Sequence, residues 1–248
     1  SACGNGCNKK EEQIQTENLI NFPVLSDALN IEYTEHDFIV NNGSEYAIVI
    51  PKVYSENEMF AAQELNTFLF KSCNVVLDIK YDAEVEYSSE SKFILIGNTK
   101  FLNDAGIVSQ HKELGNYGFV LKTVDKSVFI TGASSVNVGA LNGVYEFLRY
   151  QIGFEVYSPD EINFNQISSI KLVNIDIKDK PDIPGYIGSS YLSTRSDFMR
   201  RMRTTNRIDV MGKGNITPYH NMLVWLPVET YYSEHPEWYN NKKNQLCL

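Results

Sequence analysis

The order of apolar runs between residues 47 and 96 most limits the folds open to this chain. Residues 47–50 (Ala-Ile-Val-Ile) are expected to form a strand that stops at Pro51. Residues 93–96 (Phe-Ile-Leu-Ile) are a continuous apolar run of strand length, typical of a strand in the centre of a sheet. Between them, Ser55 and Glu58 have the spacing of a capping box, which marks the start of a helix. Residues 75–79 form one more strand-like run. This strand–helix–strand order predicts an α/β sheet.

Two hairpins are predicted as well. Residues 117–124 and 127–131 alternate in polarity around the tight turn Asp125-Lys126, the pattern of two paired antiparallel strands. Residues 38–40 end at Asn41-Asn42-Gly43-Ser44, a strong turn signal before the next apolar run. Strands joined by hairpins and strands separated by helices therefore occur in the same stretch.

A second helix follows residues 132–135 (Gly-Ala-Ser-Ser), where Ser134 or Ser135 is the expected N-cap. The turn lacks the spacing of a phosphate-binding P-loop or dinucleotide fingerprint. Gly153 ends this helix, and residues 168–179 predict a last alternating strand. The expected fold class is α/β, in the sense of an α+β mixed sheet with helices on its faces, not a doubly wound parallel sheet.

Composition narrows the function classes. The formal net charge of -9 disfavours a protein that tracks a nucleic-acid backbone, which needs a basic face. No apolar run reaches the roughly 18 residues of a membrane-spanning helix. The chain holds 15 Tyr and 13 Phe, and tyrosine combines an apolar face with a polar tip. Such surfaces suit sugars, although a Tyr-rich core and rim explains the same count.

The cysteines divide into two kinds. Cys3, Cys7, Cys73 and Cys247 form no CxxC pair, so neither a zinc site nor any other metal or cofactor is expected. Cys73 lies in a helical apolar pattern and is expected to be a buried thiol. Cys3 follows small residues, as in a bacterial lipoprotein, and is the expected lipid anchor ahead of a polar tether. A cloning or processing remnant is the alternative. The expected localisation is the periplasm or the cell surface.

Four runs between residues 117 and 160 carry a family resemblance. In chain order they are Gly-Phe-Val-Leu, Ser-Val-Phe-Ile-Thr-Gly-Ala, Gly-Ala-Leu-Asn-Gly-Val-Tyr-Glu-Phe-Leu and Gly-Phe-Glu-Val-Tyr-Ser-Pro-Asp. This order resembles the N-terminal domain that precedes the catalytic barrel in bacterial α-glucuronidases and family 20 β-hexosaminidases. Residues 220–247, with Glu-His-Pro-Glu-Trp-Tyr at 234–239, resemble a family of bacterial exported proteins of unknown function in which such a domain precedes a (β/α)8-type barrel.

The resemblance implies a domain plan. Residues 1–30 are a lipoprotein tether and lead-in, and residues 31–180 are the α/β accessory domain. Residues 181–248 are the start of a (β/α)8-type catalytic domain, beginning after the Pro-rich, charged linker 178–184. Since such a barrel takes about 250 residues, this chain is expected to hold a truncated start, with catalytic acids beyond Leu248 and no activity of its own.

Candidate substrate-binding residues lie in the last quarter of the chain. His220 and Asn221 are expected near the end of a second barrel strand, where a His can hydrogen-bond a substrate. Trp225 could stack on a sugar ring, as could Trp238, but core packing is favoured for both. Arg195 stands closest to the position where many such barrels grip sugar hydroxyls with an Arg, although residues 181–186 offer none.

Other charged residues in this region have simpler explanations. The arginines of a basic helix at 194–206 could bind an acidic sugar such as a uronate. Most of them are expected instead to form an exposed face paired with acids. Glu229, Glu234 and Glu237 are expected to be solvated surface residues, and no catalytic residue is assigned.

The expected function is carbohydrate processing, by a glycoside hydrolase acting on a polysaccharide or glycan. A non-catalytic surface glycan-binding module and a structural spacer are the alternatives. The expected partner is an oligo- or polysaccharide, with membrane contact only through the lipid anchor and with no nucleic acid. A pair of facing carboxylates in a completed barrel would favour the enzyme.

Overall fold

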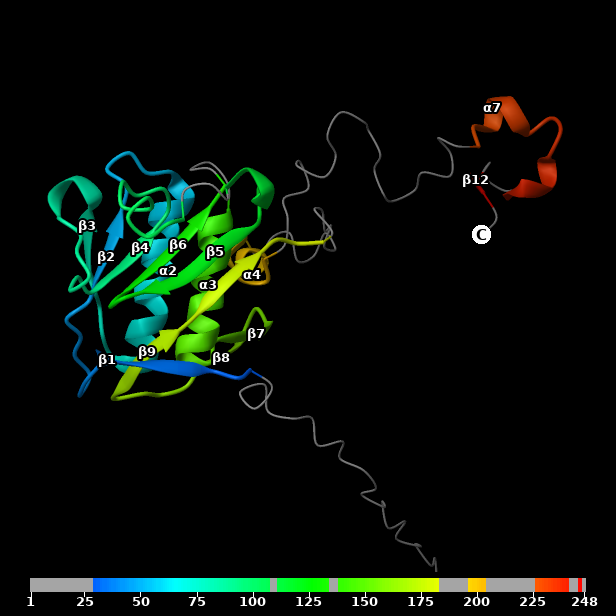
Figure 1. The fold of residues 1–248 in the computed structure, drawn as a ribbon. Helices are drawn as coiled ribbons and strands as arrows, with labels where there is room; N and C mark the ends of the chain where they lie inside the picture. The colour runs from blue at the N-terminus through cyan, green and yellow to red at the C-terminus, as the bar shows by residue number, and fades with distance from the viewer. Residues whose placement is uncertain are drawn as a thin grey trace, which may run out of the picture.

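The computed structural model describes residues 29–107, 111–133, 138–182, 196–203, 226–240 and 245–246. Its centre is a mixed sheet with the strand order β10-β5-β6-β4-β2-β3 (Figure 1). Neighbouring strands among β6, β4, β2 and β3 run parallel, whereas β5 is antiparallel to both β6 and β10. The mixed α/β architecture confirms that part of the prediction. The strands are β2 (Ala47–Ile50), β3 (Asp78–Tyr81), β4 (Phe93–Ile96), β5 (Phe119–Val124), β6 (Ser127–Gly132) and β10 (Asp176–Asp179).

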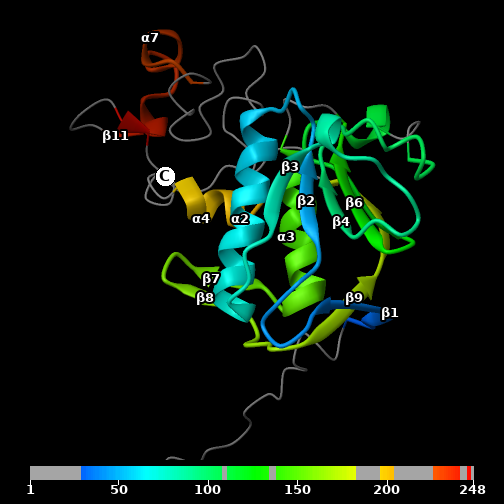
Figure 2. The same cartoon turned by 90° about the vertical axis from the view of Figure 1, so that its left-hand side faces the viewer.

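Two long helices, α2 (Glu56–Cys73) and α3 (Gly139–Ile152), cover one face of this sheet (Figure 2). Leu65 and Leu69 of α2 are fully buried against it, as the helical spacing requires. The capping box of Ser55 and Glu58 is confirmed, and the thiol of Cys73 is buried. Helix propensity and apolar burial therefore agree along α2.

The start of α3 differs from expectation. Its N-cap is Val138, whose side chain makes no capping hydrogen bond, and the expected caps Ser134 and Ser135 lie outside the described residues. The helix ends as predicted at Gly153, which has a φ of 70°, a backbone conformation that glycine adopts without steric cost. The first residue of this helix, Gly139, is already buried.

The opposite face of the sheet is covered by connecting segments. Phe101, Leu102, Ile107 and Leu114 pack there in a second apolar cluster that includes Phe129 of β6. The short helices η1 (Asp82–Glu84) and η2 (His111–Leu114) belong to these connections. The two long helices therefore share one face of the sheet, and the short η1 and η2 lie among the connections on the other.

The predicted hairpin between residues 38–40 and 47–50 is wrong. Its turn exists, because Asn41 and Asn42 have positive φ values and Val40 forms a β-bridge with Gly43. However, β1 (Glu32–Ile39) pairs antiparallel with β9 (Ile170–Asn174) in a separate two-stranded sheet. β2 is buried on both faces, so it takes a central place between β3 and β4, while the half-exposed β1 lies outside the large sheet.

The predicted last strand divides between two sheets. Its first half is β9, and its second half is β10, which pairs with β5. Thr123 of β5 binds the backbone where β9 gives way to β10. Its hydroxyl donates to the Val173 carbonyl at 2.8 Å and accepts from the Ile175 amide at 3.3 Å. A small hairpin of β7 (Glu155–Ser158) and β8 (Glu161–Asn163) precedes this segment.

The later part of the chain is described in two pieces. One is the short helix α4 (Ser196–Arg201), inside the predicted basic helix. The other contains α7 (Val228–Tyr231), η4 (Pro236–Trp238) and the paired strands β11 (Tyr239–Asn240) and β12 (Gln245–Leu246). These pieces do not by themselves make a barrel. Within the described ranges, no helix is both long and apolar enough to cross a membrane.

Candidate functional site

The carboxyl ends of parallel strands are where open α/β sheets usually bind ligands. In this chain the carboxylate of Glu58, which is 2% exposed, fills part of that edge. Its Oε2 accepts the Ser55 amide at 2.7 Å and the Ser55 hydroxyl at 3.0 Å, and its Oε1 accepts the Asn98 amide at 3.2 Å. Gly97, with a φ of 88°, makes room, because a Cβ there would lie 2.1 Å from Glu58 Oε1.

Asp82 closes the neighbouring part of the same edge. This buried carboxylate accepts the Lys52 amide at 2.9 Å and the Lys100 amide at 3.0 Å. Backbone N–H groups of this kind are what an anionic ligand would otherwise use. Along the described part of the edge, the protein's own carboxylates occupy them. Residues 134–137, which follow β6, lie outside the described residues.

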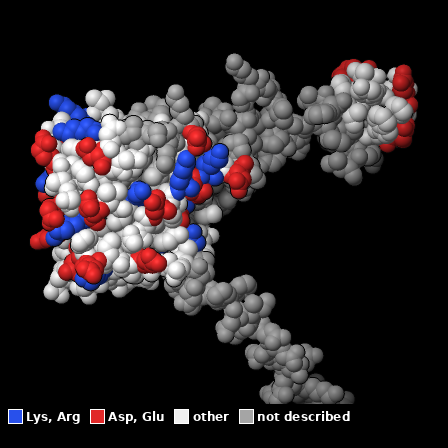
Figure 3. Space-filling model, in the orientation of Figure 1, with Lys and Arg blue, Asp and Glu red and all other residues white. Residues whose placement is uncertain are grey.

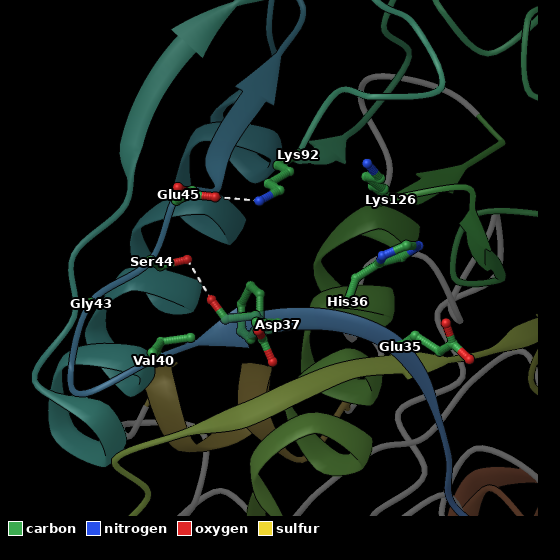
Figure 4. A pocket seen from close by; sticks show the side chains of 10 residues that line it. Glu35, His36, Asp37, Val40, Gly43, Ser44, Glu45, Lys92 and Lys126 are labelled. Carbon is green, nitrogen blue, oxygen red and sulfur yellow. Dashed lines mark hydrogen bonds and ion pairs between the residues drawn. The ribbon is translucent and has the colours of Figure 1, made fainter.

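A pocket of about 610 Å³ lies beside β1 (Figure 4). We call it the β1 pocket. Glu35, His36 and Asp37 of β1 are among its lining residues, and Lys92 and Lys126 approach from the segments that lead into β4 and β6. Its volume falls in the range of small-molecule sites in proteins, and its lining combines charged side chains with the apolar Phe38 and Val40.

The lysines of the β1 pocket already hold carboxylates. Lys92 pairs with Glu45 and Lys126 with Glu90, and the lysine side chains are 33% and 25% exposed against 79% and 76% for the acids. Hydrogen bonding to the lysine lowers the pKa of both carboxyl groups. Oppositely charged side chains are interspersed over the face of the domain drawn in Figure 3. Exposed ion pairs of this kind contribute little to stability, so their carboxylates can exchange.

Tyr46 is buried close to the same charges. It is 4% exposed, and its hydroxyl has no hydrogen-bond partner among the described residues. Burial raises its pKa to about 12, and the negative charges of Asp37 and Glu45 add to the effect. Its ring packs edge-on against Phe38 at 5.0 Å between centroids. A buried hydroxyl without a partner is costly, which makes Tyr46 unusual in this core.

The helix layer carries a second charged arrangement, which we call the arginine clamp: Arg201 with Glu64 and Arg203 with Glu146. Arg201 donates from Nε and Nη2 to the two carboxylate oxygens of Glu64, both at 2.8 Å. Tyr145 of α3 donates to the same carboxylate at 2.9 Å. The side chains of Arg201 and Glu64 are 16% and 7% exposed, so this pair is well shielded from water.

The clamp continues around this buried pair. Arg203 forms an ion pair with Glu146 of α3, and Arg149 lies 3.6 Å from the same carboxylate. The guanidinium of Arg201 also lies over the ring of Phe68, 5.2 Å from its centroid. Hydrogen bonding to Glu64 raises the pKa of Arg201, and burial raises the pKa of Tyr145 far above its usual value. α4 is thereby fixed on α2 and α3 (Figure 2).

The clamp settles part of the arginine hypothesis. Arg200 pairs with Asp197 and lies over the Phe60 ring, and Arg201 and Arg203 bind acids of the helix layer. Pairing with acids is confirmed for these three residues. The predicted exposure is wrong for Arg201, because its side chain is largely buried. Arg201 and Glu64 are 137 positions apart in the sequence, so no local sequence pattern predicts their contact.

The remaining predicted site residues have different outcomes. His220, Asn221, Arg195, Trp225 and the anchor Cys3 lie outside the described residues. Trp238 is 37% exposed, so core packing was wrong for it. Its ring stacks on His235 with centroids 3.8 Å apart. Glu229, Glu234 and Glu237 are exposed as expected. No cluster of metal-binding side chains occurs in the described part of the chain.

The β1 pocket and the arginine clamp are not evident from the sequence pattern. Lys92 and Lys126 stand in polar turns that look like ordinary surface, and Glu64 reads as one of several acids along α2. The one available signal was the acid placed between apolar positions of α2. An acid there needs a partner when it is buried.

No protein-family model matches this sequence, and no curated protein matches it. Among solved structures it is similar to glycoside hydrolases of families GH84, GH20 and GH115. CpGH84D matches with 15% identity and a TM-score of 0.43 over 70% of this chain and 28% of its own. The GH20 β-N-acetylhexosaminidase from Streptomyces coelicolor matches with 13% identity and a TM-score of 0.39 over 62% and 25%.

A family GH115 4-O-methyl-α-glucuronidase with specificity for decorated arabinogalactans matches with 14% identity and a TM-score of 0.45, over 68% of this chain and 25% of its own. This chain therefore spans between a quarter and three tenths of the length of these three proteins. At these identities and TM-scores, the similarity assigns no activity to the chain.

Proposed function

We propose that this chain contributes a non-catalytic α/β accessory domain to a carbohydrate-processing protein, a glycoside hydrolase acting on a polysaccharide or glycan. The observation that carries the accessory role is the arginine clamp, in which α4 is held on the helix layer by the shielded pair of Arg201 and Glu64. A domain that buries charged side chains to hold the segment after its linker is suited to positioning a neighbouring domain.

The carboxylates that fill the described part of the sheet's carboxyl edge support the non-catalytic part of the proposal. The carboxylate oxygens of Glu58 and Asp82 accept hydrogen bonds from backbone amides. Neither carboxylate is therefore placed to act as a general acid or base. Paired carboxylates facing a scissile bond are what glycoside hydrolysis needs. The carbohydrate part of the proposal rests on the sequence resemblance of residues 117–160 and 220–247 to domains of glycoside hydrolases. Export as a lipoprotein anchored through Cys3 belongs to the same proposal.

The test compares this chain with the product of the complete reading frame of its gene. Both are assayed for release of reducing sugar from a panel of uronic-acid-bearing, amino-sugar-bearing and neutral polysaccharides. We expect turnover by the complete product and none by this chain, whose folding is checked by circular dichroism. Turnover by this chain would contradict the accessory role. A complete product that neither binds nor cleaves any saccharide would contradict the carbohydrate assignment and favour a structural spacer.

A glycan-binding module without catalysis is the second candidate. The β1 pocket favours it, because its charged and hydroxyl side chains offer both donors and acceptors to sugar hydroxyls. Saccharide binding by the complete product without any cleavage would distinguish this candidate from the enzyme.

A further inference from the structure

Two tyrosine rings stack on each other beside the carboxyl ends of β2 and β3. Tyr81 is the last residue of β3 and lies opposite Ile50, the last residue of β2. Tyr54 belongs to the loop that leads from β2 into α2 (Figure 2). The planes of the two rings are within 4° of parallel, and their centroids are 5.9 Å apart. The fold therefore joins two separate segments of the chain in one aromatic pair.

The pair is layered outward from the core. Tyr81 is partly buried and packs against the apolar cluster under the two long helices, whereas Tyr54 is 42% exposed. Because Tyr81 lies against one face of the Tyr54 ring, the exposed area of Tyr54 belongs to its edge and its other face. The outer face of this ring is a flat apolar surface that is open to solvent.

Both tyrosines are held in place by their neighbours. Tyr54 directly precedes Ser55, the N-cap of α2, whose amide donates to Glu58 at 2.7 Å. The Tyr81 amide donates to Glu84 at 3.2 Å. The charge of Tyr54, and then a hydrogen bond between the two side chains, raise the pKa of Tyr81, so the two hydroxyl groups meet as well. A ring that is fixed in advance loses little conformational freedom when a ligand binds.

The surroundings of the pair indicate what kind of ligand fits. Val53, next to Tyr54, is 88% exposed. Exposed charged side chains occur within three positions of one or the other tyrosine: Lys52, Glu56 and Glu84. The apolar area of this loop is therefore small and has a charged rim, unlike the roughly 800 Å² per partner of a stable protein interface.

A sugar ring matches such a surface. The C–H groups on one face of a pyranose can pack against an aromatic ring, as other apolar groups do. Its hydroxyl groups can both donate to carboxylates and accept from an ammonium group. A neutral sugar needs no unpaired charge in the protein, and one ring covers about the area that one tyrosine offers.

We propose that the outer face of Tyr54 stacks on a pyranose ring of a neutral glycan, with Tyr81 behind it as a positioning residue. This inference rests on the proposed carbohydrate function and adds to it a glycan-binding site on the accessory domain. The site lies outside the β1 pocket and uses none of its residues.

Isothermal titration of this chain with three neutral hexasaccharides tests the proposal. Cellohexaose and chitohexaose are flat β-linked chains that present ring faces, whereas the α-linked maltohexaose is curved. We expect at least one of the flat chains to bind, and maltohexaose to bind more weakly than that chain. Absence of binding by all three would overturn the proposal.

Variants of Tyr54 separate the ring from its hydroxyl. Tyr54→Ala is expected to weaken binding roughly tenfold, and Tyr54→Phe to leave it within about twofold. Tyr54→Trp is expected to strengthen binding, because its ring is larger. Tyr157→Ala is the matched control, since it removes a ring that is 59% exposed on β7, beside the other end of α2 (Figure 2). It is expected to leave binding unchanged.

The positioning role of Tyr81 has its own test. Tyr81→Leu removes the ring behind Tyr54 and is expected to weaken binding, whereas Tyr81→Phe keeps that ring and is expected to restore it. Circular dichroism checks that each variant is folded. Equal binding by Tyr81→Leu and the parent would overturn the role of Tyr81.

Three further results would overturn the glycan site. One is unchanged binding in Tyr54→Ala, and another is a loss in Tyr54→Phe as large as in Tyr54→Ala. The third is self-association of this chain that Tyr54→Ala abolishes, without sugar binding, which would make the pair a protein-docking site. If the complete product of the gene binds or cleaves saccharides while this chain binds none, the site proposal fails and the proposed function stands. If the complete product neither binds nor cleaves any saccharide, both fail.

Discussion

Arg201 binds Glu64 from 137 positions later in the chain through two hydrogen bonds of 2.8 Å. Phe60, Glu64 and Phe68 are spaced four residues apart on α2 and so form one stripe along the helix. Arg200 covers the first of them, and Arg201 covers the other two. α4 therefore contacts a single face of α2, with the ion pair at the centre.

Replacing Arg201 by Met should lower the free energy of unfolding by about 3 kcal/mol, because it leaves the shielded Glu64 carboxylate without its cation. Urea unfolding followed by circular dichroism measures the change. Arg200→Met is the matched control on the same helix, and its exposed pair with Asp197 should matter by less than about 1 kcal/mol. The double variant Glu64→Leu and Arg201→Met should recover only part of the loss, because Glu64→Leu also removes the acceptor of the buried Tyr145 hydroxyl. Equal effects of the two single arginine variants would count against the clamp.

Gly97→Ala should destabilise the fold by at least about 3 kcal/mol. Its φ of 88° disfavours a side chain, and the new Cβ would lie 2.1 Å from Glu58 Oε1, which displaces the carboxylate that closes the sheet edge. Gly106→Ala is the control, since Gly106 has a φ of 70° but open space around it. That variant should cost only about 1 kcal/mol. Thermal unfolding of both variants separates steric displacement from backbone strain.

Tyr46→Phe should stabilise the protein by about 1 kcal/mol, because it removes a buried hydroxyl that lacks a partner. Tyr145→Phe should instead destabilise it by about 1 kcal/mol, since the Tyr145 hydroxyl donates to Glu64 at 2.9 Å. The chemical change is the same in both variants, but chemical denaturation should show opposite changes in the free energy of unfolding. Stabilisation by both would mean that the Tyr145 hydrogen bond contributes nothing.

Stability should fall at alkaline pH partly through Tyr46. Its pKa is raised from 10.0 to about 12 in the folded protein, so its contribution is complete below pH 10 and is lost as the pH rises toward 12. Between these values the unfolded chain releases the proton more readily. The stability advantage of Tyr46→Phe over the parent should therefore grow by about 1 kcal/mol from pH 8 to pH 11. An advantage independent of pH would refute the raised pKa.

Local signals in the sequence identified the elements that depend on local interactions. The capping box of Ser55 and Glu58, the hairpin across Asp125 and the glycine at the end of α3 all involve residues within a few positions of one another. The mixed sheet was predicted from the order of apolar runs. These features need no knowledge of the rest of the chain.

The errors arose where distant segments compete for a partner. The turn at Asn41 and Asn42 is a good hairpin turn, yet β2 is so apolar that two parallel neighbours bury it better than β1 could. The run at 168–179 reads as one strand, but its halves meet different partners. The β1 pocket and the clamp depend on side chains from separate segments, which no spacing rule brings together.

β1 and β9 run side by side with Glu32 opposite Asn174, so a strand from the front of the α/β domain is paired with a strand from near its end (Figure 1). These two strands form a sheet of their own, in which each is the other's partner. A shortened chain that begins at β2 would therefore leave β9 with an unpaired edge. Such an edge is a template for association with another chain, so trimming the front of the domain should promote aggregation.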